Sequence, residues 1–509
     1  RLLEELSRAA GVPIDRRSPA ADHVHRPFIA AALLVTLTIG AGWGAWLLWR
    51  IGMGGDFRAA SVGHVVAHGD AQLWGFVALF IAGIALRWLP VATATRPASA
   101  LLAQTTLAAV LLGVAGGFAW AMRPAELVWL GVSSGVALFA AAVLIAGFFV
   151  HRVGTRLPQT WAVAVVCAGL WWIAWGDLQV WLRWTHGSSG PGGYSLSERD
   201  ANILLAVFGV AVNAVYGFGL RLLPGIVGGS VRRRRAALAV AAHNLGLLLL
   251  SAGHVTSRAA LELAGTSGIA IGAVVFAAAL PGLTRLKQFS KRPEQGPPVL
   301  SRYVQLAVFW LVAGLLLLLA GQASSVVTGQ PMPHAWRGAA RHALTVGFLT
   351  TLIMGVAQRI LPIVGHTLLA WPALTTPILL LVGVGNAWRV MTELATLVWA
   401  PAFRIMPVSA VLELAALALF AANALRTLWP RRDPLLRQGR VTERSSVAVL
   451  LAEHPWIEDR LIELGVDYLA RTRSVPRELT VGSLARSERL DPAEFIERVE
   501  LLLCAERGQ

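Results

Sequence analysis

Long apolar stretches separated by short polar segments dominate the chain. A hydrocarbon core ~30 Å thick needs about 20 apolar residues of helix to cross it. On that measure the pattern predicts twelve transmembrane helices. Their approximate limits are 28–49, 62–88, 99–121, 126–150, 160–182, 200–222, 236–256, 260–282, 303–327, 338–360, 373–397 and 406–428.

A spaced motif of two glycines, an arginine and a proline occurs on the second, sixth and tenth predicted helices. Its three copies are Gly75, Gly83, Arg87 and Pro90, then Gly209, Gly217, Arg221 and Pro224, and then Gly347, Gly355, Arg359 and Pro362. Self-similarity at a nearly fixed period indicates repeated structural units. We therefore predict three pseudo-repeats of four helices, in which the arginine reaches the headgroups and each helix stops before the proline.

Composition excludes an ordinary water-soluble protein. Hydrophobic residues make up 56% of the chain, charged residues only 14%, and the mean hydropathy is +0.62. We predict an all-α polytopic membrane protein. The net charge of +16 does not indicate nucleic-acid binding, because the basic residues lie in short loops between apolar spans.

The basic residues predict the orientation of the helices. With the N-terminus placed in the cytoplasm, the inner loops carry fifteen Lys and Arg and the outer loops carry ten, among them Arg183 and Arg389. Because cytoplasmic loops are enriched in these residues, both termini are predicted to be cytoplasmic.

Four regions follow from these patterns: an N-terminal tail (1–27), a membrane domain (28–428), a basic linker (429–444) and a small helical domain (445–509). In the last, Asp491 and Pro492 supply an N-cap and a first-turn proline. The segments LIELGVDYL and TVGSLARSERLDPAEFIERV resemble the DUF1858-type domain.

Two histidines occupy matching depths in repeats one and three. His68 precedes Arg87 by ~28 Å of helix, and His342 precedes Arg359 by ~25 Å, at ~1.5 Å per residue. Histidine inside a membrane span is costly and is usually functional. Neutral imidazole is a common haem-iron ligand, so we expect His68 and His342 to face one another across a haem. The alternative is a packing histidine bonded to a neighbouring carbonyl or hydroxyl.

Further histidines are candidate metal ligands. His254 has a depth similar to that of His68 and could converge on it. His64 lies one turn from His68, and His243 lies about three turns below His254 on the same face. Copper is the second candidate metal.

Four other residues extend the candidate site. Gly75 and Gly347, close to the two proposed ligands, permit either close helix packing or room for a porphyrin. Asp70 and Asp177 are acidic residues that could assist proton movement.

Three segments resemble the NnrS family: RPFIAAALLV at 26–35, the stretch VAHGDAQLWGFVALFIAG, and RHALTVGFLTTLIMGVAQRILP. The resemblance implies a bacterial cytoplasmic-membrane protein of twelve helices that binds haem and copper and responds to nitric oxide. It spans roughly residues 26–430.

The layout is also similar to haem-copper oxidase and nitric-oxide reductase catalytic subunits, which carry metal ligands on helices 2, 6, 7 and 10. That similarity implies one haem held by His68 and His342. This chain departs from the pattern at the copper positions, where it has Asn213 and Tyr216 on helix 6 and His243-Asn244 on helix 7. Any copper would then need other ligands, and His64, His243 and His254 are available.

The leading hypothesis is a haem-binding, copper-binding membrane protein of the nitric-oxide response. Its expected partners are the lipid bilayer, nitric oxide or a related small ligand, and quinol or another electron donor. One alternative is a degenerate reductase of nitric oxide or oxygen. Another is a haem-free transporter, since repeats and midplane polar residues also mark transporters.

Overall fold

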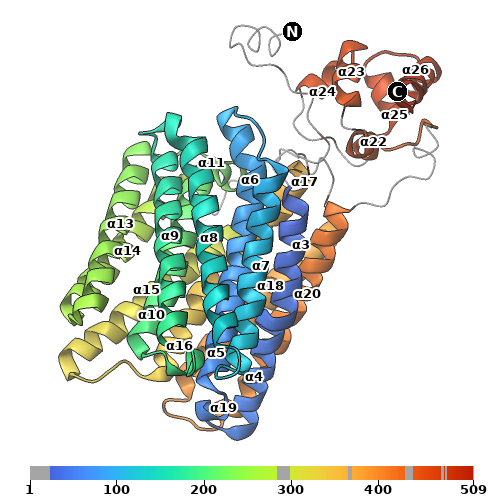
Figure 1. Ribbon diagram of the computed structural model, residues 1–509. Coiled ribbons are helices and arrows are strands. Elements are labelled where there is room, and N and C mark those ends of the chain that lie inside the picture. The colour runs from blue at the N-terminus through green and yellow to red at the C-terminus, as the bar shows by residue number, and fades with distance from the viewer. Residues whose placement is uncertain are drawn as a thin grey trace.

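A bundle of long helices forms the body of the molecule (Figure 1). The computed structural model describes residues 23–283, 299–364, 369–429, 440–454, 456–471, 475 and 479–507. Within these ranges it holds no strand, and twelve helices are long and apolar enough to cross a membrane. The predicted all-α, multi-pass membrane fold is confirmed. Most of the predicted N-terminal tail and basic linker lies outside the described residues.

Several of the twelve spans consist of consecutive helical segments. In chain order they are α3 (His25–Val35), η1 (Thr36–Gly40) and α4 (Ala41–Gly54); α5 (Val62–Gln72), η3 (Leu73–Ala78) and α6 (Leu79–Thr93); α7 (Ala100–Met122); α8 (Val128–Val153); α9 (Thr160–Thr185); α10 (Leu196–Leu204), η6 (Leu205–Val212) and α11 (Asn213–Leu222); α13 (Arg233–Thr256); α14 (Ala259–Ala279); α15 (Val299–Thr328); α16 (His334–His342), η9 (Ala343–Thr350) and α17 (Thr351–Val364); α18 (Thr375–Ala395); and α19 (Ala402–Ile405) with α20 (Pro407–Leu428).

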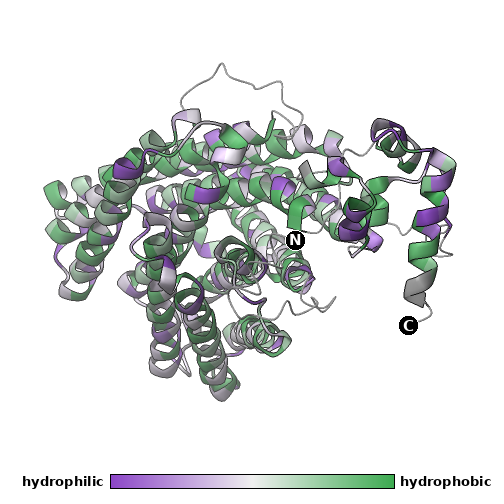
Figure 2. Cartoon of the chain, turned by 90° about the horizontal axis from the view of Figure 1, so that it is seen from above, coloured by the Kyte–Doolittle hydropathy of each residue, from purple (hydrophilic) through white to green (hydrophobic). Residues whose placement is uncertain are grey.

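Spans 2, 6 and 10 form the centre of the bundle. Their most apolar windows are 72, 78 and 67% buried, against 33 to 50% for the other nine spans of the described chain. The outer helices instead turn large apolar side chains outward, and Leu112, Leu245 and Phe309 are mostly exposed. Figure 2 shows this apolar character along the helices. Since hydrocarbon rather than water surrounds such a surface, the exposed side chains are suited to face lipid.

The three central spans share a local deviation from α-helix. Each contains a π-helical segment, η3, η6 and η9, and the first glycine of the repeat motif lies inside each of them, at Gly75, Gly209 and Gly347. A π-helical segment widens the turn and leaves carbonyl groups outside the normal hydrogen-bond ladder. The sequence repeat is therefore also a repeat of backbone geometry.

The prolines of the motif end only one of the three helices. Helix α11 stops at Leu222, two residues before Pro224, as predicted, and Pro224 begins a further short helix, α12 (Pro224–Val227). The prediction was wrong for the other two, because α6 continues past Pro90 to Thr93 and α17 past Pro362 to Val364. Proline removes one N–H, and in a last turn few intrahelical hydrogen bonds remain to be lost.

Spans 7 and 8 pack through small residues. A Cβ atom built on Gly265 of α14 would lie 2.3 Å from the backbone nitrogen of Leu250 and 2.6 Å from the carbonyl oxygen of Gly246, both on α13. Backbone contact of this kind is how helices associate inside a membrane, where the hydrophobic effect contributes little between apolar faces.

The residues after the bundle form a second apolar core. Val441, Leu461, Leu484 and Leu503 belong to it. It is built by five short helices: α22 (Val447–Glu453), α23 (Ile457–Glu463), α24 (Asp467–Arg471), α25 (Val481–Ser487) and α26 (Pro492–Arg507).

Replacing Gly265 with leucine should separate α13 from α14. We expect the free energy of unfolding to fall by roughly 1–3 kcal/mol or more, because the neighbours that must move are backbone atoms. Unfolding of the detergent-solubilised protein by dodecyl sulfate measures this free energy. Gly147→Leu is the matched control, since nothing lies within 4 Å of the added Cβ. Equal stability of the two variants would contradict the proposed contact.

Candidate functional site

His68 lies on α5 and is held by a carbonyl of the first span. Its Nδ1 lies 2.9 Å from the carbonyl oxygen of Gly40. Because a carbonyl only accepts, Nδ1 carries the proton and Nε2 has a free lone pair. Gly40 stands between η1 and α4 with ψ of −111°, far from helical values, and this turn releases its carbonyl from the helix. The ring also covers Gly44, where a Cβ would lie 2.4 Å from the ring carbon Cε1.

His342 ends α16, where the π-helical segment η9 begins. Its Nδ1 lies 2.9 Å from the carbonyl oxygen of Gly338 and 3.4 Å from Oε2 of Glu393 on α18. This ring is therefore oriented as the His68 ring is, with Nδ1 as donor and Nε2 on the opposite edge. Within the described part of the chain, neither Nε2 makes a hydrogen bond.

A buried polar cluster surrounds His342. Arg389 on α18 lies 3.3 Å from Glu393 through Nη2 and Oε2 and also contacts the sulfur of Met406. Glu413 of α20 lies within electrostatic reach of His342, Arg389 and Glu393. Its Oε1 has no hydrogen-bond partner among the described residues. The same cluster reaches His68, which interacts electrostatically with His342 and Arg389. Spans 2, 10, 11 and 12 thus contribute to one polar interior.

The remaining predicted metal ligands do not join these two rings. His254 bonds Glu262 through Nδ1 and Oε1 at 2.9 Å. His243 is fully buried, and its Nε2 lies 2.8 Å from the carbonyl oxygen of Phe208. His64 packs edge-on against Trp43. The convergence of His254 with these rings stays a prediction, and its observed partner is a carboxylate on the next helix. No group of three or more His, Cys, Asp and Glu residues suited to a metal ion occurs in the described ranges.

An amide pair joins spans 6 and 7. Asn213 donates to Oδ1 of Asn244 at 3.2 Å, and Asn244 donates to Oδ1 of Asn213 at 2.9 Å. Trp171 donates to the same Asn244 oxygen at 3.0 Å. These reciprocal bonds satisfy the side chains with one another and do not fit a copper ion.

The two candidate glycines are points of close helix packing. A Cβ on Gly75 would lie 2.3 Å from Cγ1 of Val35, and one on Gly347 would lie 2.5 Å from both Nδ2 of Asn386 and Cγ of Trp310. Of the two interpretations that the sequence left open, packing accounts for both positions.

Asp70 is paired with side chains of two other spans. Arg183 of α9 lies 3.4 Å from it, and Asn202 of α10 donates to its Oδ1 at 2.8 Å. Arg183 also bonds Gln179 at 3.0 Å and contacts Ser134 of α8. This network ties together spans 2, 4, 5 and 6. Asp177 instead lines a cavity at the surface of the bundle.

Sequence reasoning assigned Arg183 and Arg389 to outer loops, and that assignment was wrong. Both lie inside helices, and their side chains are 2 and 8% exposed. The sequence signal that could have placed them correctly was their position within or next to an apolar span. An arginine inside a membrane span usually pairs with a buried acidic residue. Removing both from the outer loops increases the inner excess of basic residues.

Comparison with known proteins identifies a family. A family model described as NnrS protein matches residues 19–432, which include all twelve helices. No curated protein matches the chain at a significant level.

Arg183→Ala should destabilise the bundle by about 3–5 kcal/mol, because the substitution leaves Asp70 buried without its cation. The unfolding free energy in detergent measures the loss. The matched control is Arg123→Ala, since the Arg123–Glu126 pair is 71 and 68% exposed and such pairs contribute about 0–1 kcal/mol. A similar decrease in unfolding free energy in the two variants would show that the buried pair stabilises the bundle no more than the exposed pair.

Proposed function

The chain belongs to the NnrS family of nitric-oxide-response membrane proteins, and we propose that it binds a haem between His68 and His342. The observation that supports this proposal is that the two imidazole rings make the same kind of hydrogen bond. Each has Nδ1 on a backbone carbonyl and no hydrogen bond at Nε2 within the described residues. Metal-ligating histidines are commonly oriented by this second hydrogen bond.

The two anchoring carbonyls give the proposed ligands a fixed tautomer. Gly40 ends the π-helical segment η1 of span 1, whereas Gly338 lies inside α16 of span 10, four residues before His342. Because each Nδ1–H is engaged, Nε2 is the nitrogen available to iron. A haem held by these two histidines would supply reversible one-electron chemistry and an iron centre for nitric oxide.

Residues around His342 make its environment differ from that of His68. Glu393 adds a carboxylate 3.4 Å from Nδ1, and Arg389 compensates its charge. A carboxylate behind a histidine raises the basicity of the ligand. His68 has only the Gly40 carbonyl at its Nδ1, so we infer that Glu393 is a positioning and tuning residue on one side of the site.

Copper and a dinuclear reductase receive less support. The Asn213–Asn244 pair joins spans 6 and 7, where the similar oxidases carry copper ligands, and His243 is bonded to a carbonyl. We therefore assign no copper ligand and derive no reduction step. Binding of nitric oxide at a haem, for sensing or protection, is the function that we propose.

Purified full-length protein should show a Soret band, and His68→Ala and His342→Ala should each reduce its haem-to-protein ratio to near zero. Each substitution removes one of the two side chains that would hold the haem. The pyridine haemochrome assay measures the ratio. His64→Ala is the control, because His64 lies one turn from His68 and packs on Trp43. Full haem content in either ligand variant, or none in the unchanged protein, would refute the site.

Glu393→Gln should raise the haem midpoint potential by roughly 60 mV, the one-electron equivalent of a tenfold change in equilibrium. The carboxylate favours the more positive ferric state, and its loss also leaves Arg389 uncompensated. Redox titration of the haem band measures the shift. Glu126→Gln is the control, since Glu126 is exposed. An unchanged potential with full haem content would exclude the tuning role.

A further inference from the structure

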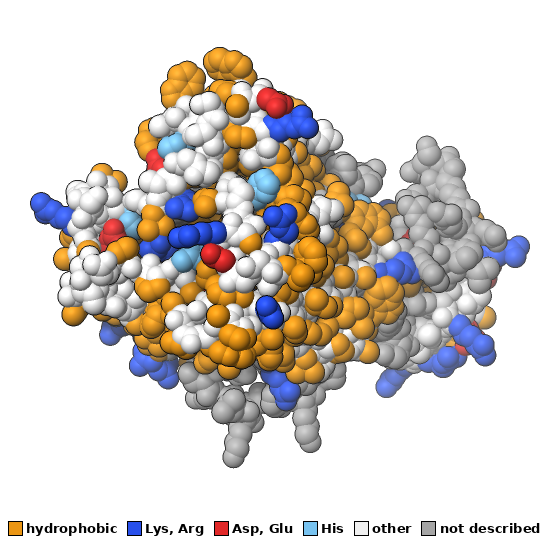
Figure 3. Space-filling view, turned by 90° about the horizontal axis from the view of Figure 1, so that it is seen from below, with side chains coloured by type: hydrophobic (Ala, Val, Ile, Leu, Met, Phe, Trp, Pro, Cys, Tyr) orange, Lys and Arg blue, Asp and Glu red, His pale blue; other side chains and the backbone are white. Residues whose placement is uncertain are grey.

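A cavity of about 200 Å³ lies between α10, α13, α14, α15 and α16. It is at the end of the bundle where α10 and α16 begin, which the charge pattern predicts to be the outer end. Figure 3 views the molecule from below and shows basic, acidic and histidine side chains gathered near the middle of this face. The cavity is distinct from the proposed haem site, because neither His68 nor His342 lines it.

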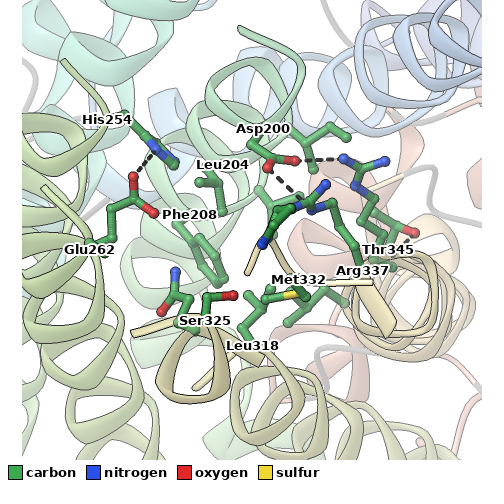
Figure 4. A pocket seen from close by; sticks show the side chains of 17 residues that line it. Asp200, Leu204, Phe208, His254, Glu262, Leu318, Ser325, Met332, Arg337 and Thr345 are labelled. Atoms are coloured by element: carbon green, nitrogen blue, oxygen red, sulfur yellow. Dashed lines mark hydrogen bonds and ion pairs between the residues drawn. The ribbon is translucent and has the colours of Figure 1, made fainter. Parts of the chain in front are cut away.

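Polar groups stand at two opposite walls of this cavity (Figure 4). On one wall, Nδ1 of His254 bonds Glu262 at 2.9 Å, and Nε2 is buried without a hydrogen-bond partner among the described residues. On the other, Asp200 bonds Arg341 at 2.6 Å and lies 3.3 Å from Arg337. Each wall therefore offers a hydrogen-bond donor or acceptor to an oxygen atom.

Apolar side chains form the surface between the two walls. Leu204 and Phe208 come from span 6, and Leu318 and Met332 come from α15 and the segment that follows it. Phe208 is fully buried and presents an aromatic ring. A flat apolar ring with an oxygen at each end matches this arrangement of polar walls and apolar floor.

The charges of the cavity favour a neutral ligand. Arg337 and Arg341 share one carboxylate, Asp200, and Glu262 lies opposite them at electrostatic range of Arg337. Two arginines and two carboxylates thus line the same space, so the lining has no excess formal charge for a phosphate or an ammonium group. Arg199 lies outside the lining, at electrostatic range of Arg337. A lipid headgroup would have to displace one of these ion pairs.

A second cavity of about 280 Å³ adjoins the first and shares His254 and Leu204 with it. Trp181 and Val255 also line the second cavity, and they are apolar side chains that are 48 and 87% exposed. An apolar tail attached to a ring in the first cavity can leave through the second into lipid.

We propose that these two cavities bind a quinone or quinol, with the ring between His254 and Arg341 and the isoprenoid-type tail over Trp181. The oxygen at one end meets Nε2 of His254, which accepts from a hydroxyl or, when protonated, donates to a carbonyl. The oxygen at the other end meets Arg341 and Asp200, which offer a donor and an acceptor. Both redox forms of the ligand are therefore accommodated.

Equilibrium binding of a radiolabelled benzoquinone with a ten-carbon tail tests the site on the full-length protein in lipid nanodiscs. Saturable binding of one quinone per chain is expected. Leu204→Trp fills the junction of the two cavities and should weaken binding more than tenfold. Leu248→Trp is the matched control, because Leu248 is 57% exposed on α13 and lines neither cavity.

A second pair of variants keeps side-chain size constant. Glu262→Gln should weaken quinone binding about tenfold, because the wall at His254 loses its charge-assisted hydrogen bond. Glu126→Gln should leave quinone binding unchanged. Unchanged affinity in both cavity variants would overturn the proposal. So would the absence of saturable quinone binding together with a bound phospholipid that Leu204→Trp releases.

The quinone site goes beyond the proposed haem function and can fail independently of it. Quinone binding should persist in His68→Ala, whose haem is lost, because the cavity residues are elsewhere. Haem without quinone binding would overturn this inference alone, and quinone binding without haem would overturn the haem site alone.

Discussion

The bundle depends on one constraint: a charged side chain inside an apolar environment must meet its counter-charge across a helix contact. Three such contacts hold the interior. Arg183 meets Asp70 between spans 5 and 2, and Arg389 meets Glu393 within span 11, where His342 of span 10 also approaches. Arg337 and Arg341 of span 10 meet Asp200 of span 6. The contacts between different spans, Arg183–Asp70, Arg341–Asp200 and His342–Glu393, restrict how these helices rotate against one another, and that rotation decides which other side chains face inward.

The same contacts explain the environment of the proposed ligands. Asp70 lies two residues after His68 on α5, so its pairing with Arg183 turns this helix and limits the directions in which the His68 ring can point. Glu393 approaches Nδ1 of His342 while Arg389 compensates its charge. The π-helical segment η1 ends at Gly40, whose carbonyl meets His68, while His342 meets the carbonyl of Gly338 one turn earlier in its own helix. Ion pairing between helices and these two carbonyl contacts leave both imidazoles with Nδ1 as the donor.

The three central spans share a backbone feature but differ in the side chains next to it. All three carry the glycine inside a π-helical segment, at Gly75, Gly209 and Gly347, which reflects their common pattern. Only spans 2 and 10 carry a histidine shortly before this segment. At the centre of span 6, Asn213 pairs with Asn244. One repeat therefore supplies packing, and the other two supply candidate chemistry.

The sequence by itself determined the features that depend on local composition. The number of helices follows from the length of apolar stretches, the repeat from spaced glycines, and the depth of His68 and His342 from counting residues along a helix. The partner of each buried charge was not predictable, and Arg183 and Arg389 were consequently assigned to loops. Pairing depends on how helices distant in sequence rotate and approach, which no local pattern encodes. Only the tertiary structure therefore decided that His254 pairs with Glu262, that Gly40 supplies a carbonyl to His68, and that two polar walls enclose a cavity.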